Sequence, residues 1–157
     1  MPNDTDELPG GLRLTLQHTA DEAAAEFMHQ QLREYNNAHS PYHRESRTPE
    51  TAPQPLEIYV RDASGALLGG LTGDTVWDWL YIARLWLADS LRGSGLGTRL
   101  MGLAEDEARR RDCTHAHLRT FSFQARGFYE KLGYRVIGAL EGYPPGEAFY
   151  WMRKDFT

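Results

Sequence analysis

The chain has 157 residues, a mass of 17.9 kDa and a formal net charge of −5, which is the size of one domain with a substantial core. Apolar residues make up 41% of it and no stretch reaches the roughly 18 apolar residues of a membrane span, so composition excludes a wholly disordered chain and a transmembrane helix. Residues 1–52 hold four arginines and nine acids, and residues 53–157 hold thirteen bases and thirteen acids. Neither segment has the excess of basic residues that binding to nucleic acid or to an anionic membrane requires.

The first third of the chain predicts a strand and a helix between two polar segments. Residues 1–11 are polar and contain Pro9-Gly10-Gly11, which predicts a flexible tail. Apolar and polar residues alternate over 12–17, as in a half-buried strand. Apolar residues then recur at helical spacing over 21–36. Between Asn37 and Pro55 lie three prolines and almost no aliphatic side chains, so we expect a long loop or a loop with a short helix.

Three closely spaced strands and a strong helix follow. Residues 56–62, 66–73 and 77–88 read as strands joined by short turns. From Ser90 onward leucines and alanines recur every three or four residues, and Glu105, Asp106 and Glu107 each precede an arginine by four residues. This pattern predicts an amphipathic helix with ion pairs on its surface.

The last third predicts a strand over 115–120, a helix over 123–132 that ends at Gly133, and strands over 134–140 and 148–154. A helix between two strands implies that these strands pair in parallel, whereas the hairpins on either side imply antiparallel pairing. The expected architecture is α+β, a mixed sheet with helices on its faces.

A glycine-rich turn precedes the strong helix. Gly93, Gly95 and Gly97 fall within five residues, and a helix start offers unpaired N–H groups and partial positive charge. The turn therefore predicts a phosphate site. A Walker loop is disfavoured because Thr98-Arg99 follow the last glycine where Lys and Ser or Thr are required. A dinucleotide fingerprint is disfavoured because Thr98 stands at its third glycine and three strands precede the turn.

Two segments resemble the GNAT acetyltransferase superfamily. Arg92-Gly-Ser-Gly95-Leu-Gly97 is similar to its pyrophosphate loop, Q/R-x-x-G-x-G/A, between a strand and a helix. Residues 122–134 are similar to its N-x-x-A-x-x-x-Y-x-x-x-G-F/Y segment, with Tyr129 at the tyrosine and Ser122 in place of the asparagine. The resemblance covers residues 12–157. It implies a single domain over residues 1–157 with a mixed, mostly antiparallel sheet of six to seven strands flanked by helices.

The resemblance also implies acetyl-CoA as the acetyl donor. Its pyrophosphate would lie on the loop that comprises Arg92, Gly93, Ser94, Gly95, Leu96, Gly97 and Thr98. Leu85, Trp86 and Leu87 occupy the strand segment that carries a β-bulge in the family, where the Leu85 amide would face the thioester carbonyl and the backbone of Leu87 would pair with pantetheine. An oriented main-chain N–H can stabilise a developing oxyanion.

The resemblance places Tyr129 near the sulfur of CoA, as the acid that protonates the leaving thiolate. An ordinary tyrosine pKa near 10 suits that task. The base is less defined: the matching strand has no acid, which leaves Asp78 or a water chain, with Glu57, Asp74, His115 and His117 on neighbouring strands. Ser122 is a further candidate contact to CoA.

The acceptor groove of the family is formed by the segment after the first helix and by the last hairpin turn. Tyr42 and Arg44, with their neighbours His43 and Arg47, are candidates for an anionic acceptor group, and Trp79, with Trp77 and Trp86, for an apolar wall. The net negative charge favours a cationic acceptor instead. His39 and His43 are separated by Pro41, which disfavours a shared metal, so no metal is expected.

The sequence therefore predicts a cytoplasmic N-acetyltransferase that transfers the acetyl group of acetyl-CoA directly to a primary amine of a small molecule or protein. The cytoplasmic prediction rests on an acidic N-terminus without a signal-peptide pattern, and the lone Cys113 excludes an internal disulfide. The alternatives are a CoA-binding sensor or assembly subunit without turnover and a nucleotide-binding module. Homodimers are frequent in the family.

Overall fold

The computed structural model describes residues 4–46, 48 and 51–156, with only the backbone of residues 4–6. These residues fall into two compact units, one ending at Arg44 and one beginning at Glu45, which are described separately. The predicted single domain over residues 1–157 stays a prediction.

The N-terminal unit contains a hairpin and a long helix. Strand β1 (Asp4–Leu8) pairs antiparallel with β2 (Leu12–Leu16), so the predicted tail is wrong over residues 4–8, where a polar sequence forms a strand. Helix α1 (Glu22–His39) begins at Asp21, whose carboxylate accepts the Ala24 N–H at 2.9 Å, and it runs beyond its predicted end at 36. Helix α2 (Pro41–Glu45) is the short helix expected within 37–55.

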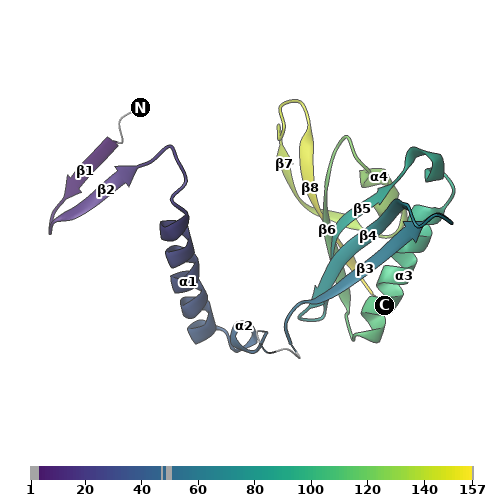
Figure 1. The fold of residues 1–157 in the computed structure, drawn as a ribbon, viewed down its shortest axis with the longest axis horizontal. Helices are drawn as coiled ribbons and strands as arrows, with labels where there is room; N and C mark the ends of the chain where they lie inside the picture. Colours follow the sequence, from purple (N-terminus) through teal and green to yellow (C-terminus); the bar gives the residue numbers. More distant parts are fainter. Residues whose placement is uncertain (1–3, 47, 49–50, 157) are drawn as a thin grey trace. The chain divides into compact units, whose positions relative to one another are not determined.

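The C-terminal unit is a six-stranded sheet with two helices on one face (Figure 1). In chain order its elements are β3 (Gln54–Arg61), β4 (Leu67–Val76), β5 (Trp79–Leu87), the 3-10 turn η1 (Asp89–Leu91), α3 (Leu96–Arg110), β6 (His115–Phe121), α4 (Arg126–Lys131), β7 (Arg135–Glu141) and β8 (Ala148–Asp155). The strand order is β3-β4-β5-β6-β8-β7, and only β5 and β6 are parallel. The expected mixed, mostly antiparallel sheet flanked by helices is confirmed.

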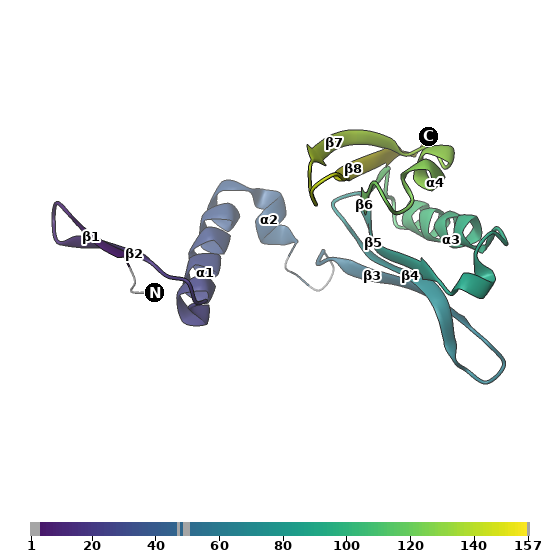
Figure 2. The same cartoon turned by 90° about the horizontal axis from the view of Figure 1, so that it is seen from above.

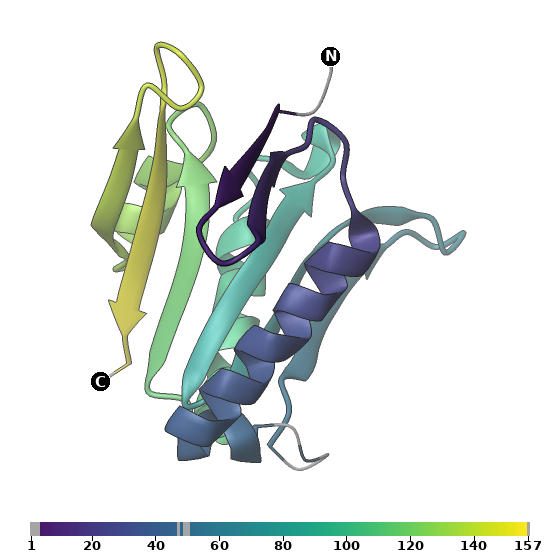
Figure 3. The ribbon, with the colours of Figure 1, turned by 90° about the vertical axis from the view of Figure 1, so that its left-hand side faces the viewer.

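The core of this unit lies between the sheet and α3, which packs across β3, β4 and β5. In Figure 3 the helix lies behind the strands, so the opposite face of the sheet is toward the viewer. The fully buried large side chains come from four strands and the helix: Leu71, Leu80, Met101, Leu118 and Met152. Glu105 of α3 is also buried and accepts a 2.6 Å hydrogen bond from Lys154 of β8. This bond connects the helix to a strand beyond β3, β4 and β5 in the sheet.

The turn between β4 and β5 differs from the predicted strand over 77–88. Trp77 and Asp78 both have positive φ, 50° and 63°, and form a two-residue hairpin loop before β5 starts at Trp79. Asp78 tolerates this conformation well and Trp77 does not, so the sequence carries only half of the usual turn signal.

Candidate active site

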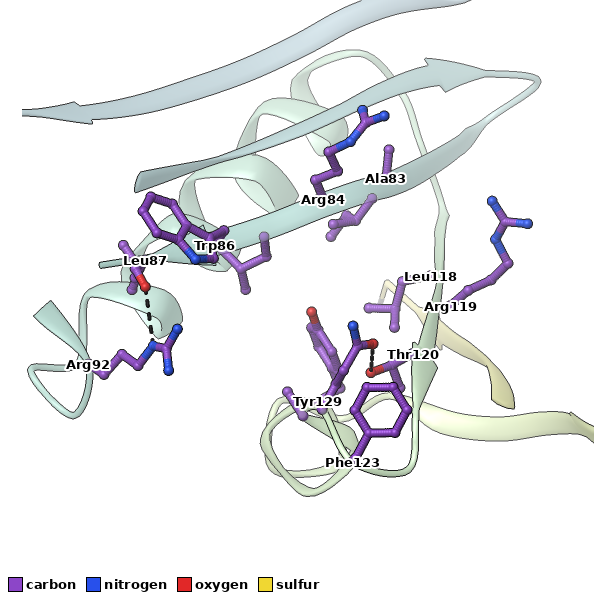
Figure 4. A pocket seen from close by; sticks show the side chains of 14 residues that line it. Ala83, Arg84, Trp86, Leu87, Arg92, Leu118, Arg119, Thr120, Phe123 and Tyr129 are labelled. Carbon is purple, nitrogen blue, oxygen red and sulfur yellow. Dashed lines mark hydrogen bonds between the residues drawn. The ribbon is translucent and has the colours of Figure 1, made fainter. Parts of the chain in front are cut away.

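A cleft opens where β5 and β6 stop pairing. Their parallel ladder runs from Trp79/His115 to Ile82/Leu118, and beyond it the strands diverge (Figure 3). Figure 2 shows the same two strands from above. The cleft between them has a volume of about 740 Å³. Its lining comes from β5, the segment after β5, β6 and the segment around α4: Ile82, Ala83, Arg84, Leu85, Trp86, Leu87, Arg92, Leu118, Arg119, Thr120, Phe123, Gln124, Ala125 and Tyr129 (Figure 4).

The backbone of β5 offers N–H groups to this cleft. The Ala88 N–H donates to the Leu68 carbonyl at 2.9 Å, which marks a hydrogen-bonded pair with β4. Because such pairs alternate along an antiparallel ladder, Trp86 also bonds to β4, while the N–H groups of Leu85 and Leu87 point the other way. Since β6 no longer pairs there, both groups face the cleft. The Leu87 carbonyl points the same way, because it accepts the Arg92 Nε–H at 3.2 Å.

A β-bulge precedes these two residues. Thr72 pairs with Arg84 and Gly73 with Ile82, so Ala83 is the extra residue of β5. The expectation of a bulge at residues 85–87 is therefore wrong by two residues. A bulge is defined by which residues of two neighbouring strands pair, and the sequence of one strand does not reveal that pairing.

The glycine loop leads from this end of the cleft into α3. Arg92 lines the cleft and forms an ion pair with Asp89 at 3.0 Å. Gly93 and Gly95 have φ values of 74° and 80°, and a Cβ at either would meet nothing within 4 Å, so the loop surface beside them is open.

The start of α3 fits an anion. The N-cap residue Gly95 has no side chain, and Ser94 Oγ accepts only the Leu96 N–H, at 3.4 Å. The first turn of α3 holds no acid, and the N–H groups of Gly97 and Thr98 have no hydrogen-bond partner among the described residues. Ser94 turns its hydroxyl toward the Leu91 carbonyl, to which it donates at 2.6 Å, and Leu96 begins the helix. These unpaired donors suit the pyrophosphate expected there.

Tyr129 of α4 reaches the cleft from the side opposite β5 (Figure 4). Its ring packs against Phe128 and Tyr134, and only 8% of the residue is exposed. Burial raises the pKa of the Tyr129 phenol above its usual value, so the group stays protonated at neutral pH. Its hydroxyl makes no hydrogen bond within the part of the chain that is described, which leaves its proton available to a bound molecule.

Asp78 and Ser122 do not line this cleft. Asp78 occupies the β4–β5 turn, about 23 Å along an extended strand from Leu85, where its carboxylate accepts the Thr114 hydroxyl at 2.7 Å. Its predicted role as the base does not fit this position. Ser122 donates its hydroxyl to Glu147 and accepts the Ala148 N–H at 2.9 Å, so it holds the start of β8 instead of lining the cleft.

The other base candidates also lie outside the cleft lining. Glu57 accepts the Tyr59 hydroxyl at 2.8 Å on β3, and Asp74 lies on β4. His115 stacks on Trp79 with ring centroids 4.5 Å apart, and His117 stacks on Tyr81 at 4.8 Å. Burial lowers the pKa of His117 below its ordinary value.

The predicted acceptor residues are distributed over both units. Trp79 starts β5 at the end away from the cleft. Tyr42 and Arg44 belong to α2 at the end of the N-terminal unit, and Arg47 lies outside the described residues. Their predicted contacts with an acceptor stay predictions.

Several cleft residues were missed by the sequence analysis. Arg84 and Arg119 carry the charge of the diverging strands, and the Arg119 guanidinium donates to the Tyr81 hydroxyl at 2.7 Å. Gln124 accepts the Phe121 N–H at 2.9 Å and so shapes the turn before α4. The available signal was Arg84 within β5, whose other residues are all apolar or aromatic, because charged side chains are rarely buried.

Two further properties concern the described residues alone. None of their helices has both the length and the apolar character that a membrane crossing requires. They also hold no group of three or more His, Cys, Asp or Glu side chains that could bind a metal ion.

Residues 20–134 match the sequence model of the family described as Acetyltransferase (GNAT) family. The chain is 41% identical over 113 residues to the blasticidin-S acetyltransferase of Streptomyces morookaense, an alignment that covers 69% of this chain and 83% of that one. It is 32% identical over 145 residues to an acetyltransferase of Agrobacterium fabrum, which covers 92% and 100% of the two chains.

A solved structure agrees with these relatives. The crystal structure of an acetyltransferase from Bacillus cereus matches with a TM-score of 0.76 and 28% identity, over 90% of this chain and 97% of that one.

Proposed function

Because the chain belongs to the GNAT family of acetyltransferases, we propose that it transfers the acetyl group of acetyl-CoA to a primary amine of a small molecule. The observation that carries this proposal is the cleft between β5 and β6, which is faced by two backbone N–H groups and lined by Tyr129 and by Arg92 at the start of the glycine loop. The catalytically silent CoA-binding sensor is not favoured, since the relatives of this chain are acetyltransferases.

The donor would bind along the cleft from the glycine loop to β5. The unpaired N–H groups of Gly97 and Thr98 and the guanidinium of Arg92 would hold the pyrophosphate. The Leu87 N–H, which points away from β4, would pair with an amide of the pantetheine arm like an added strand. This arrangement brings the thioester toward Leu85 and Tyr129.

The reaction would then be a direct displacement. The neutral amine attacks the thioester carbonyl carbon, a C–N bond forms, and negative charge develops on the carbonyl oxygen. The Leu85 N–H faces this part of the cleft and would stabilise that charge. When the C–S bond breaks, Tyr129 would give its proton to the leaving thiolate, and the amine nitrogen loses a proton to water.

The proton of the amine has no acceptor side chain in the lining of the cleft. The titratable groups among the described lining residues are three arginines and Tyr129. We therefore propose that the acceptor binds as the free amine or transfers its proton through water. No carboxylate needs to be assigned to this step.

The relative from Streptomyces morookaense is a blasticidin-S acetyltransferase, so blasticidin S is the first acceptor to test. Calorimetric titration with acetyl-CoA, CoA, ATP and NAD would show which of these ligands binds. Thiol release would then be followed over a panel of amines that includes blasticidin S, polyamines and peptide N-termini. We expect CoA ligands to bind, ATP and NAD not to, and one small amine to release thiol. Absence of CoA binding would refute the proposal, and CoA binding without turnover of any amine would favour the sensor.

A further inference from the structure

We propose that the acceptor carries a carboxylate close to its amine, and that Arg84 and Arg119 bind this carboxylate. The inference rests on the proposed function and specifies the acceptor of the same site. It starts from two guanidinium groups on the two strands that form the cleft.

Both arginines lie on the face of the sheet opposite α3 and α4. Leu85 packs against the core on the face that carries α3 and α4, so the adjacent Arg84 points to the opposite face. Arg119 lies between the buried residues Leu118 and Thr120 and points the same way. Figure 4 shows both guanidiniums on the far side of the cleft from Tyr129. A molecule that approaches the thioester from that face passes between them.

Neither guanidinium forms an ion pair with the described residues, and the carboxylate of Asp74 on this part of the sheet acts on His117 of the same strand as Arg119. Arg84 makes no ion pair or hydrogen bond with the described residues, and Arg119 bonds only to the neutral Tyr81 hydroxyl, at 2.7 Å. No acid is among the described residues that line the cleft. A guanidinium presents planar donors that match a carboxylate, so two of them on opposite strands form a suitable receptor for that group.

The same charges favour the reactive form of the amine. A nearby positive charge disfavours an ammonium ion and lowers its pKa, commonly by about one unit or more. The arginines would thus shift a bound acceptor toward the neutral amine, which is the nucleophile. This effect fits a cleft whose described lining contains no carboxylate or imidazole base. A polyamine without an anionic group would be repelled.

The test uses conjugates in which the CoA sulfur is linked through –CH2–CO–NH– to an alkyl tail that ends in a carboxylate, and matched conjugates whose tails end in a carboxamide. Because the tail is attached to CoA, these probes can be used before the natural acceptor is identified. In a series of tail lengths, we expect the carboxylate to bind about tenfold more tightly than its carboxamide at one length or more, measured by calorimetry. Tenfold corresponds to about 1.4 kcal/mol, a modest value for a charge-assisted contact to solvated arginines.

Variants assign the effect to the two arginines. The double variant R84Q/R119Q should bind CoA as the unaltered protein does and lose the carboxylate preference, while R119K should keep it. R135Q is the matched control, because Arg135 starts β7 and pairs with Asp155 at 3.0 Å outside the cleft. Equal binding of carboxylate and carboxamide at every tail length, or a preference that survives R84Q/R119Q, would overturn the inference. Failure to bind CoA itself would instead refute the proposed function.

Discussion

The substitution Tyr129→Phe tests the acid of the proposed reaction. It removes one hydroxyl that makes no hydrogen bond with the described residues and keeps the packed ring of a residue that is 8% exposed. Stability should therefore change by less than about 0.5 kcal/mol. General acid catalysis accelerates reactions by about 10² to 10⁴. Because a thiolate is a weak base that leaves readily without full protonation, we expect an effect near 10². We expect kcat to fall about 100-fold, or ~2.7 kcal/mol, with the Kd of acetyl-CoA within about threefold.

Tyr134→Phe is the matched control. Tyr134 contacts the Tyr129 ring and is 2% exposed, and burial together with the nearby Glu105 carboxylate raises the pKa of its phenol. Since Tyr134 does not line the cleft, its variant should keep kcat. The assay is thiol release at saturating acetyl-CoA with the best amine of the panel. Equal kcat for the unaltered protein and Tyr129→Phe, or equal losses in both variants, would refute the assignment.

Three further predictions test the backbone and the pH dependence. Gly95→Ala strains a φ of 80° and should weaken CoA binding about tenfold at a cost of about 1–2 kcal/mol, whereas Gly102→Ala in the middle of α3 should leave CoA affinity unchanged in the same titration. Leu85→Pro removes the N–H that faces the cleft and should lower kcat by about 10²–10³ with a small change in Tm, while Trp86→Pro breaks a bond to β4 and should lower Tm strongly. In the folded state the pKa of His117 is lowered from its ordinary value of 6.5, so as the pH falls the unfolded state binds the proton before the folded state does. Stability measured by urea unfolding should therefore fall as pH drops through 6.5 and level off below the folded pKa, and His117→Gln should flatten this slope.

Regular periodicity explains which elements the sequence predicted. Helix α3 was found because its apolar residues recur on one face, and those residues meet the sheet in the structure. The glycine loop is predictable because closely spaced glycines before a helix indicate a turn with positive φ, which Gly93 and Gly95 adopt. Strand β1 was missed, since Asp4–Leu8 carries three acids and its partner β2 supplies the alternating leucines.

The arrangement of the cleft was less predictable because it depends on how strands pair. Asp78 is a candidate base in the sequence because it precedes residues 81–85, which hold no acid, and in the structure it lies in the turn at the end of β5 away from the cleft. Arg84 and Arg119 are far apart in the sequence. They meet at one cleft only because β5 and β6 pair for four residues and then diverge.

The bulge at Ala83 links these observations. Before it, the even-numbered residues Leu80 and Ile82 are buried against α3, and after it the odd-numbered residues Leu85 and Leu87 pack on the same core. If this sequence alternated strictly, with no bulge at Ala83, Arg84 and Trp86 would point into the core and the two leucines to the opposite face. One inserted residue therefore decides both properties of the strand. It leaves the leucine side chains in the core while their N–H groups face the cleft, and it places the Arg84 charge on the side from which the acceptor would approach.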